Sequence, residues 1–363
     1  MPSITISGAR TKDNLCTYLN ENVYEAAKAR IRKILDLYDT VVVAFSGGKD
    51  SLVVLHLLKE IYDERGLTEP VNVIFRDEEL IPDCVIEFMD KYRQLPWIKL
   101  LWFAVPLKSN KYILGKTYDY VQWDRDREWV RPKPPWSIQD DSVVYDQYSM
   151  DAKVADYFPG KICVLTGIRA SESLVRLRAI VNKINETVVA NTQCKRVNLG
   201  RPIYDWEEDD VFQYFFQKKV QYCTIYDVQH VNGENLRVST PIHAEASKRL
   251  TALRSRDPLF YERVLKVFPE VAVQERYFKD VDVYAAMAQY PMTAEGILQY
   301  IDDNITDFEQ NELAHDRYRS VMHRHSYMPD SYPLEHIFKA FISGAYKRQI
   351  MPAPRKKKDV GKG

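Results

Sequence analysis

The segment formed by residues 41–51 constrains the fold of this chain more than any other stretch. Five apolar residues (41–45) run directly into Ser-Gly-Gly-Lys-Asp-Ser (46–51), and a leucine-rich pattern with helical spacing follows. A short apolar run that ends at a glycine turn indicates a buried strand, and paired glycines allow a tight turn because they carry no Cβ. A helix is expected to begin at about Lys49, so that its free N–H groups and the lysine ammonium converge on the turn. This arrangement predicts a phosphate-binding loop.

The spacing excludes two common phosphate-binding loops. A Walker A loop needs a glycine five residues before its Gly-Lys pair, and that position holds Val43. The dinucleotide fingerprint needs a glycine on each side of one residue, whereas Ala44 and Ser46 flank Phe45. The alternative is a glycine turn that binds nothing. We favour the phosphate site because strand, loop and helix occur in the required order.

Residues 46–51 resemble the PP-loop, Ser-Gly-Gly-x-Asp-Ser, of the adenine nucleotide α-hydrolase superfamily, which includes ATP pyrophosphatases, ATP sulfurylases and phosphoadenosine phosphosulfate (PAPS) reductases. Residues 167–173 are similar to the Gly-x-Arg-x-x-Glu-Ser motif of PAPS reductases and of the small ATP sulfurylase subunit. Residues 202–206, Pro-Ile-Tyr-Asp-Trp, resemble a Pro-x-x-Asp-Trp segment that precedes a helix in the same family. The three motifs occur in the family's order, so the chain is identified as a member of the PAPS reductase-like branch.

Strands and helices that alternate along the first half of the chain predict an α/β fold, a parallel twisted sheet with helices on both faces. Ligands of such sheets bind beyond the carboxyl ends of the strands. Residues 46–51, the acidic residues 77–79 and Arg169 each follow a predicted strand and are expected to meet at that edge. We also predict a helix from Leu15 to Tyr38. The predicted strands are residues 41–45, 71–75, 99–105 and 161–166.

We predict three parts of the chain. Residues 1–235 form the PP-loop nucleotide-binding domain, residues 236–350 an all-α accessory region, and residues 351–363 a basic disordered tail. Residues 106–160 interrupt the domain with a stretch rich in Trp, Tyr, Arg and Pro. This insertion is either a functional lid, whose arginines grip a base or phosphates, or a solvated segment with a small satellite core. The arginines concerned are Arg125, Arg127 and Arg131.

The resemblance implies that an adenine nucleotide, either ATP or a sulfonucleotide (APS or PAPS), binds at the sheet edge. Lys49, Asp50 and Arg169 are the expected catalytic residues: the two cations stabilise charge that develops at the reacting group, and Asp50 orients the loop or a Mg²⁺ ion. Asp50 and Asp77 are the candidate Mg²⁺ ligands, and the alternative for Asp77 is a carboxylate that faces solvent. The expected nucleotide-binding residues are Ser46, Gly47, Gly48, Lys49, Asp50, Ser51, Asp77, Gly167, Arg169 and Glu172.

The resemblance implies less about the reaction. Thiol-dependent members of the family use a cysteine in a C-terminal Glu-Cys-Gly motif, whereas this chain has no cysteine after Cys223. The cysteine arrangement that carries an iron–sulfur cluster is also missing, so no such cluster is expected. We expect an enzyme, either PAPS reductase- or sulfotransferase-like or an adenylating N-type ATP pyrophosphatase. The alternative is a non-catalytic nucleotide-binding module of a larger defence or mobile-element complex that includes nucleic acid.

Composition sets the remaining limits. Basic and acidic residues both number 51, so net charge does not indicate a nucleic-acid binder, although the basic tail and the helical region are candidate contacts for a protein or nucleic-acid partner. No apolar run approaches the ~20 residues of a membrane span, and no signal peptide is visible. The five cysteines are odd in number and never spaced as C-x-x-C. We therefore expect a cytoplasmic protein without membrane contact.

Overall fold

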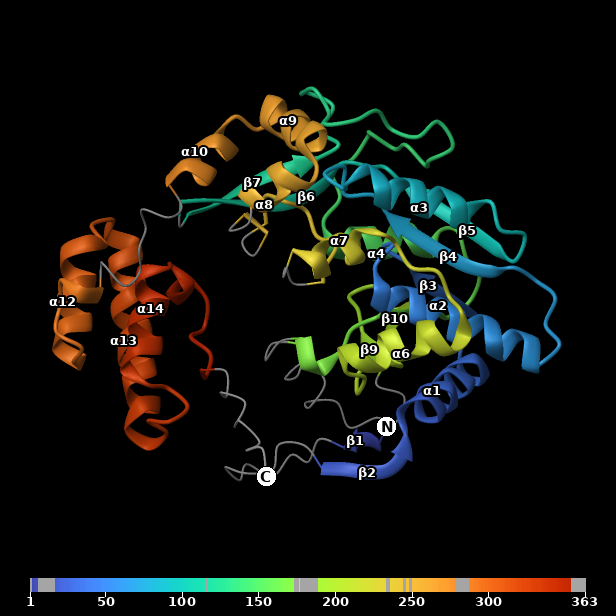
Figure 1. The fold of residues 1–363 in the computed structure, drawn as a ribbon, viewed down its shortest axis with the longest axis horizontal. Helices are drawn as coiled ribbons and strands as arrows, with labels where there is room; N and C mark the ends of the chain where they lie inside the picture. Colours follow the sequence, from blue (N-terminus) through green and yellow to red (C-terminus); the bar gives the residue numbers. More distant parts are fainter. Residues whose placement is uncertain are drawn as a thin grey trace. The chain divides into compact units, whose positions relative to one another are not determined.

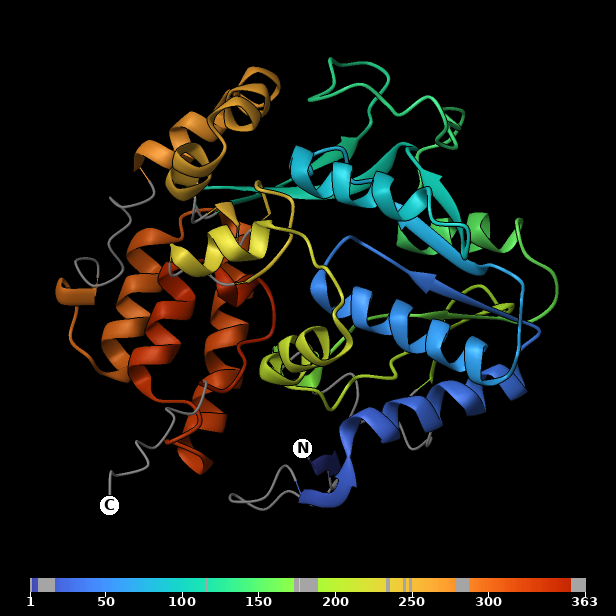
Figure 2. The ribbon, with the colours of Figure 1, turned by 45° about the vertical axis from the view of Figure 1, so that its right-hand side comes forward.

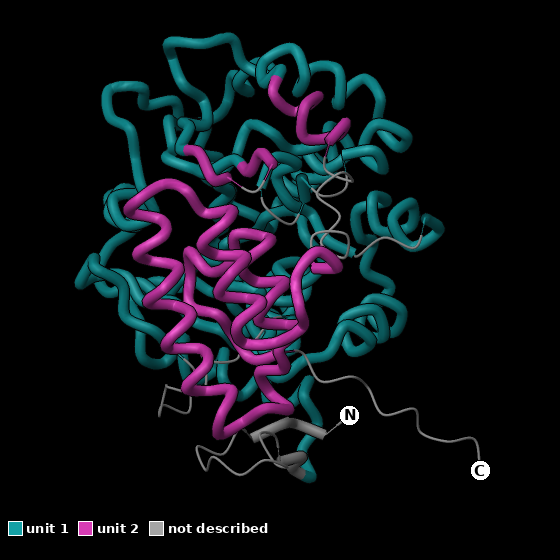
Figure 3. The backbone as a smooth tube through the Cα atoms, turned by 90° about the vertical axis from the view of Figure 1, so that its left-hand side faces the viewer, with its two compact units in different colours: residues 1–111, 119–269 teal, residues 112–118, 270–363 magenta. Residues whose placement is uncertain are grey.

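The structure is a computed structural model, and its contacts group the chain into two compact units (Figure 3). One unit contains residues 1–111 and 119–269, and the other contains residues 112–118 and 270–363. Residues 236–269, which we predicted to begin the helical accessory region, therefore group with the sheet. The described residues are 2–5, 17–114, 116–172, 176, 189–232, 236–243, 246–247, 250–277 and 287–353, with residues 2–5 and 17–19 described by their backbone alone.

A six-stranded sheet forms the centre of the first unit (Figure 1). Five strands are parallel, and the edge strand β9 runs antiparallel to β10, so the predicted α/β fold is confirmed. β3 lies between β4 and β8, with Val43 opposite Leu165 of β8. Because β3 and β8 are adjacent and parallel, the segments that follow them leave the sheet side by side. The strands in spatial order are β5 (Ile98–Phe103), β4 (Val71–Arg76), β3 (Thr40–Ala44), β8 (Ile162–Leu165), β10 (Val197–Gly200) and β9 (Val189–Asn191).

Helices cover both faces of this sheet. Successive side chains of a strand point to opposite sides, so apolar strands such as β3 need to be covered on both faces. Val41 and Val43 belong to the core on one face, and Val42 belongs to the core on the other face. α1 and α2 lie side by side on the first face (Figure 2). The helices of the first face are α1 (Val23–Leu37), α2 (Lys49–Glu64), α3 (Asp83–Arg93) and α6 (Glu208–Lys218), and α4 (Gln147–Ala155) packs on the second.

The predicted helix from Leu15 was wrong in its first part. β1 (Pro2–Thr5) pairs antiparallel with β2 (Thr17–Asn22), and α1 begins only at Val23. Asn22 ends the strand and caps the helix, since its side chain accepts a hydrogen bond from the Tyr24 backbone N–H at 2.9 Å. β6 (Leu107–Ile113) and β7 (Lys116–Gln122) form a two-stranded sheet, of which residues 112–118 group with the second unit. The remaining elements of the first unit are the short helix η1 (Ala170–Glu172), α7 (Ile225–Val231), α8 (Leu250–Arg256) and α9 (Pro258–Val267).

The C-terminal part of the second unit, from residue 270 on, is helical, as predicted for the C-terminal region. Ile297, Ile301, Phe338 and Phe341 are buried in a core of its own. Apolar spacing also predicts a helix over residues 281–287, most of which lies outside the described residues, as does most of the predicted basic tail. None of the helices that the structure describes is both long and apolar enough to cross a membrane. The helices of this unit are α10 (Glu270–Tyr277), α12 (Ala294–Asn304), α13 (Phe308–Tyr327), α14 (Leu334–Ile342) and the short helix η4 (Ala345–Lys347).

His56 of α2 makes the stability of the sheet unit depend on pH. Its ring packs against Trp97 and its Nε2 lies 3.0 Å from the Tyr92 hydroxyl, and burial lowers the pKa of His56 to about 4. The unfolded chain takes up this proton near pH 6.5, whereas the folded protein takes it up only near pH 4. Stability is therefore lost as pH falls between these values, by about 3 kcal/mol at most from this group.

We predict that His56→Gln reduces this loss. Urea unfolding at pH 7 and at about pH 4.5 measures the change in unfolding free energy for wild type and variant. His230→Gln is the control, because His230 is exposed on α7. An equal loss of stability in the wild type and in His56→Gln would show that His56 does not cause it.

Candidate functional site

The loop between β3 and α2 has the conformation that its two glycines predicted. Gly47 has a φ of +74°, and a Cβ added there would lie 2.8 Å from Val85 Cγ1. A side chain at this position would be strained by its backbone and would collide with α3. Gly48 is the N-cap residue of α2, and the helix begins at Lys49 as predicted.

Two serines hold the loop closed. The Ser46 backbone N–H donates to Ser51 Oγ at 3.2 Å, and the Ser51 hydroxyl donates to the Gly48 carbonyl at 3.0 Å. Ser51 is buried and Ser46 is exposed. Ser51 therefore shapes the loop from inside, whereas the Ser46 hydroxyl is accessible to a ligand.

Gly167 brings the segment after β8 against the first turn of α2. A Cβ on Gly167 would lie 2.5 Å from both the Asp50 carbonyl carbon and the Ser51 nitrogen, which are backbone atoms that cannot rotate away. Only glycine fits this approach. It places Arg169 beside Asp50, with Arg169 Nε 2.6 Å from Asp50 Oδ1.

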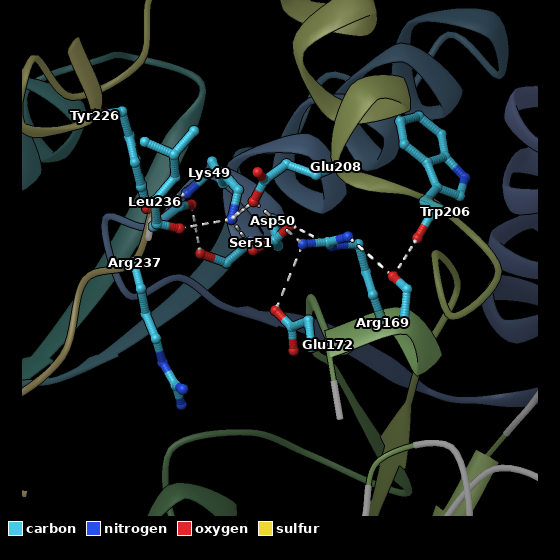
Figure 4. A network of polar contacts seen from close by, with 12 residues as sticks. Lys49, Asp50, Ser51, Arg169, Glu172, Trp206, Glu208, Tyr226, Leu236 and Arg237 are labelled. Atoms are coloured by element: carbon cyan, nitrogen blue, oxygen red, sulfur yellow. Dashed lines mark hydrogen bonds and ion pairs between the residues drawn. The ribbon is translucent and has the colours of Figure 1, made fainter. Parts of the chain in front are cut away.

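Lys49 contacts the same carboxylate from the other side (Figure 4). Its Nζ lies 3.2 Å from Asp50 Oδ2 and donates to the Leu236 carbonyl at 3.0 Å. Lys49 and Arg169 are each 4% exposed. The structure therefore brings the three predicted catalytic residues together at the sheet edge, with Asp50 between the two cations.

Sequence reasoning missed three residues of this network. The Lys49 backbone N–H donates to the Tyr226 hydroxyl at 2.8 Å, and burial raises the pKa of Tyr226, which keeps it protonated. Glu208 Oε2 lies 3.3 Å from Lys49 Nζ. Tyr226 and the Leu236 carbonyl carry no sequence signal, because they reach the loop from distant segments. Glu208 lies in an acidic first helical turn, a pattern that by itself indicates only that these charges favour the positive end of the helix.

The segment around the third motif anchors the site. The position of Asp205 just before an acidic helix start predicts that it caps that helix, but the structure shows otherwise. Asp205 makes two contacts of 2.8 Å with the Arg30 guanidinium of α1, and the Glu207 N–H at the start of α6 donates to Asp210 Oδ2 at 2.8 Å. Trp206 is buried in the core, and its indole N–H donates to the Val23 carbonyl at 3.1 Å.

Glu172 contacts arginines. One of its carboxylate oxygens lies 3.8 Å from Arg169 Nη2, and the side chain also pairs with Arg176. The neighbouring Ser171 accepts from Arg169 Nη1 at 3.1 Å and donates to the Trp206 carbonyl at 3.2 Å. These contacts fix the orientation of the Arg169 guanidinium.

Both carboxylate oxygens of Asp77 accept hydrogen bonds from protein groups. It is 3% exposed, pairs with Arg131, and accepts hydrogen bonds from the Trp102 indole N–H at 2.8 Å and the Glu79 backbone N–H at 3.0 Å. Burial raises the pKa of the Asp77 carboxyl, and the Arg131 guanidinium opposes that rise. Asp77 thus has a structural role here, which corrects both the solvent-facing alternative and the expectation of a ligand contact.

The predicted Mg²⁺ site does not fit the observed carboxylates. Both oxygens of Asp50 contact cations, and both oxygens of Asp77 accept hydrogen bonds from protein groups. Across the part of the chain that the structure describes, no group of three or more His, Cys, Asp or Glu side chains could hold a metal ion. We therefore derive no step through a metal.

Glu79, which lies two residues after Asp77, holds the insertion (residues 106–160) in place. Glu79 is fully buried and binds the Arg127 guanidinium with both oxygens, at 2.7 and 2.6 Å. It also accepts from the Trp123 backbone N–H at 2.6 Å and the Val130 N–H at 3.0 Å. Arg127 and Arg131, which we considered for a base or phosphates, bind carboxylates instead and fix the insertion to the end of β4.

We predict that Gly167→Ala destabilises the protein by about 3 kcal/mol and disrupts the Arg169–Asp50 contact, because the new methyl group collides with backbone atoms. Gly66→Ala is the control: Gly66 has a φ of +65° but no atom within 4 Å of an added Cβ, so it carries only backbone strain, about 1 kcal/mol. Chemical unfolding measures both. Equal or smaller destabilisation by Gly167→Ala would contradict the close approach.

Comparison with known proteins assigns the chain to a family. The model of the phosphoadenosine phosphosulfate reductase domain matches residues 40–321. An uncharacterized protein of Escherichia coli (strain K12), YbdN, is 28% identical over 235 residues, and the match covers 60% of this chain but only 57% of that protein.

Similar solved structures include FMN adenylyltransferase of Candida glabrata, with a TM-score of 0.39 at 12% identity over 56% of this chain and 57% of that one. Another is PAPS reductase of Candida auris, with a TM-score of 0.32 at 15% identity over 56% of this chain and 84% of that one. Because these TM-scores are low, the assignment rests on the family match, which spans most of the chain. The chain belongs to the phosphoadenosine phosphosulfate reductase domain family.

Proposed function

We propose that this chain binds an adenine nucleotide, ATP or a sulfonucleotide such as APS or PAPS, at its PP-loop and acts at the α-phosphate or sulfonate group. The observation that supports this best is the convergence of Lys49 and Arg169 on Asp50, where β3 and β8 end. Two cations that follow different strands suit an anion with several oxygens, and the planar guanidinium can contact two of these oxygens at once.

Each residue of the loop then has a role. Lys49 and Arg169 stabilise charge that develops on the reacting phosphate or sulfonate. The exposed Ser46 hydroxyl and the glycine backbone at positions 47 and 48 line the phosphate position. Ser51 and Asp50 keep loop and cations in place, because Ser51 closes the loop and Asp50 contacts both cations. Gly167 and Glu172 position Arg169.

The reaction class follows from which nucleophile is available. Reductive cleavage of a sulfonucleotide needs a thiol, and we propose that a partner such as thioredoxin supplies it. Cleavage of ATP between its α- and β-phosphates transfers AMP to an acceptor and releases pyrophosphate, and this adenylation needs no cysteine. A following sulfur transfer, in which a separate sulfur donor displaces AMP from the acceptor, uses the same first step. We propose one of these two reactions.

A non-catalytic nucleotide-binding module is the second candidate. The helical unit supports it, because that unit has a core of its own and groups separately from the sheet. In this case the nucleotide is held at the same loop without turnover, and the helical unit is available to a protein or nucleic-acid partner.

Isothermal titration with ATP, APS and PAPS tests the binding, and assays for pyrophosphate, AMP and sulfite, with and without thioredoxin, test the reaction. We predict that at least one nucleotide binds and that Lys49→Met weakens it by tenfold or more, about 1.4 kcal/mol. Lys59→Met, on the same helix, is the control and should bind as wild type does, because Lys59 pairs with Asp63 and not with a residue of the site.

Product release identifies the reaction, and binding without product favours the module. If none of the three nucleotides binds, or if Lys49→Met and Lys59→Met bind equally well, the proposed site is wrong.

A further inference from the structure

The carboxylate of Glu208 lies between the two cations of the site (Figure 4). Glu208 is the first residue of α6, and a single oxygen atom, Oε2, lies 3.3 Å from Lys49 Nζ and 3.9 Å from Arg169 Nη2. The Glu208 side chain is 46% exposed, whereas the Lys49 and Arg169 side chains are each 4% exposed. Of these three groups, solvent therefore reaches Glu208 most readily.

Two carboxylates share these cations, and they differ in how firmly they are held. Asp50 belongs to the first turn of α2, uses one oxygen for each cation, and has contacts of 2.6 and 3.2 Å. Glu208 comes from another helix, uses one oxygen for both, and its contacts are longer. Because Coulomb attraction falls with distance and with exposure to water, Glu208 is the more easily displaced of the two.

We propose that Glu208 is an internal substitute for the anionic group of the ligand. In the free protein its carboxylate occupies the anion position between Lys49 and Arg169, and it leaves when a phosphate or sulfate group of the nucleotide enters. This inference rests on the proposed nucleotide site. It adds that the Glu208 carboxylate controls which anions reach Lys49 and Arg169.

The consequence is selectivity for highly charged anions. With Asp50 and Glu208 in place, two cations face two carboxylates. Glu172, which also lies 3.8 Å from Arg169, is balanced by its pair Arg176, so the centre of the site has no net charge. A monoanion gains little by replacing a carboxylate of the same charge. A polyphosphate brings more charge and more oxygens, and it can contact both cations and the loop at the same time.

Glu208→Gln tests the effect of the negative charge without a change in side-chain shape. Glutamine keeps the length of the side chain but removes the negative charge that a ligand must displace. We expect inorganic pyrophosphate to bind Glu208→Gln about tenfold more tightly than it binds the wild type at low salt, about 1.4 kcal/mol.

Asp209→Asn is the matched control. Asp209 is the next residue of the same helical turn, is exposed, and undergoes the same change of charge. Any general effect of a lost negative charge near the helix end appears in both variants, whereas the contact with Lys49 and Arg169 belongs to Glu208. Asp209→Asn should therefore change pyrophosphate affinity by less than about threefold.

Isothermal titration of the full chain with pyrophosphate, and separately with ATP, APS and PAPS, distinguishes this inference from the proposed function. Tighter pyrophosphate binding in Glu208→Gln than in Asp209→Asn supports the inference, even if no adenine nucleotide binds and the proposed function fails. Equal affinities in the two variants, or weaker binding in Glu208→Gln, overturn the inference, even if the wild type binds a nucleotide. Unfolding midpoints of both variants verify that they are folded.

Discussion

The Asp50 carboxylate, which contacts Lys49 with one oxygen and Arg169 with the other, is the interaction on which the site depends. Without this carboxylate, the two buried cations that flank it would repel each other strongly. Asp50 can contact both only because Gly167 lets the chain after β8 lie directly on the first turn of α2. The glycine therefore matters as much as the charged residues, although it offers a ligand no side chain.

The same kind of contact recurs around the sheet. Buried carboxylates bind arginines from distant parts of the sequence and so attach whole segments to the sheet. Removing one partner of such a pair is strongly destabilising, because it leaves the other charge buried alone. The surroundings of the site are thus fixed by charge pairing as well as by apolar packing. These pairs are Asp205 with Arg30, Asp77 with Arg131, and Glu79 with Arg127.

Local sequence predicted those parts of the site that depend on local structure. The strand before residue 46, the helix start at Lys49 and the approach of Arg169 all follow from glycine position and apolar pattern. The partners of Asp77 could not be predicted, because the local sequence around a carboxylate that follows a strand is the same whether the carboxylate binds a metal, water or an arginine. Tyr226 and Glu208 reach the loop through tertiary packing of α6 and α7, for which a single sequence contains no pairing information.

A double-mutant cycle on nucleotide binding tests the central claim, that Lys49 and Arg169 act on one anion. The affinity of the best-binding nucleotide would be measured for wild type, Lys49→Met, Arg169→Met and the double variant. The account predicts that both single variants bind more weakly and that their effects are not additive, with a coupling of about 1 kcal/mol or more. Additive effects, or a single variant that binds as wild type does, would contradict a shared anion site.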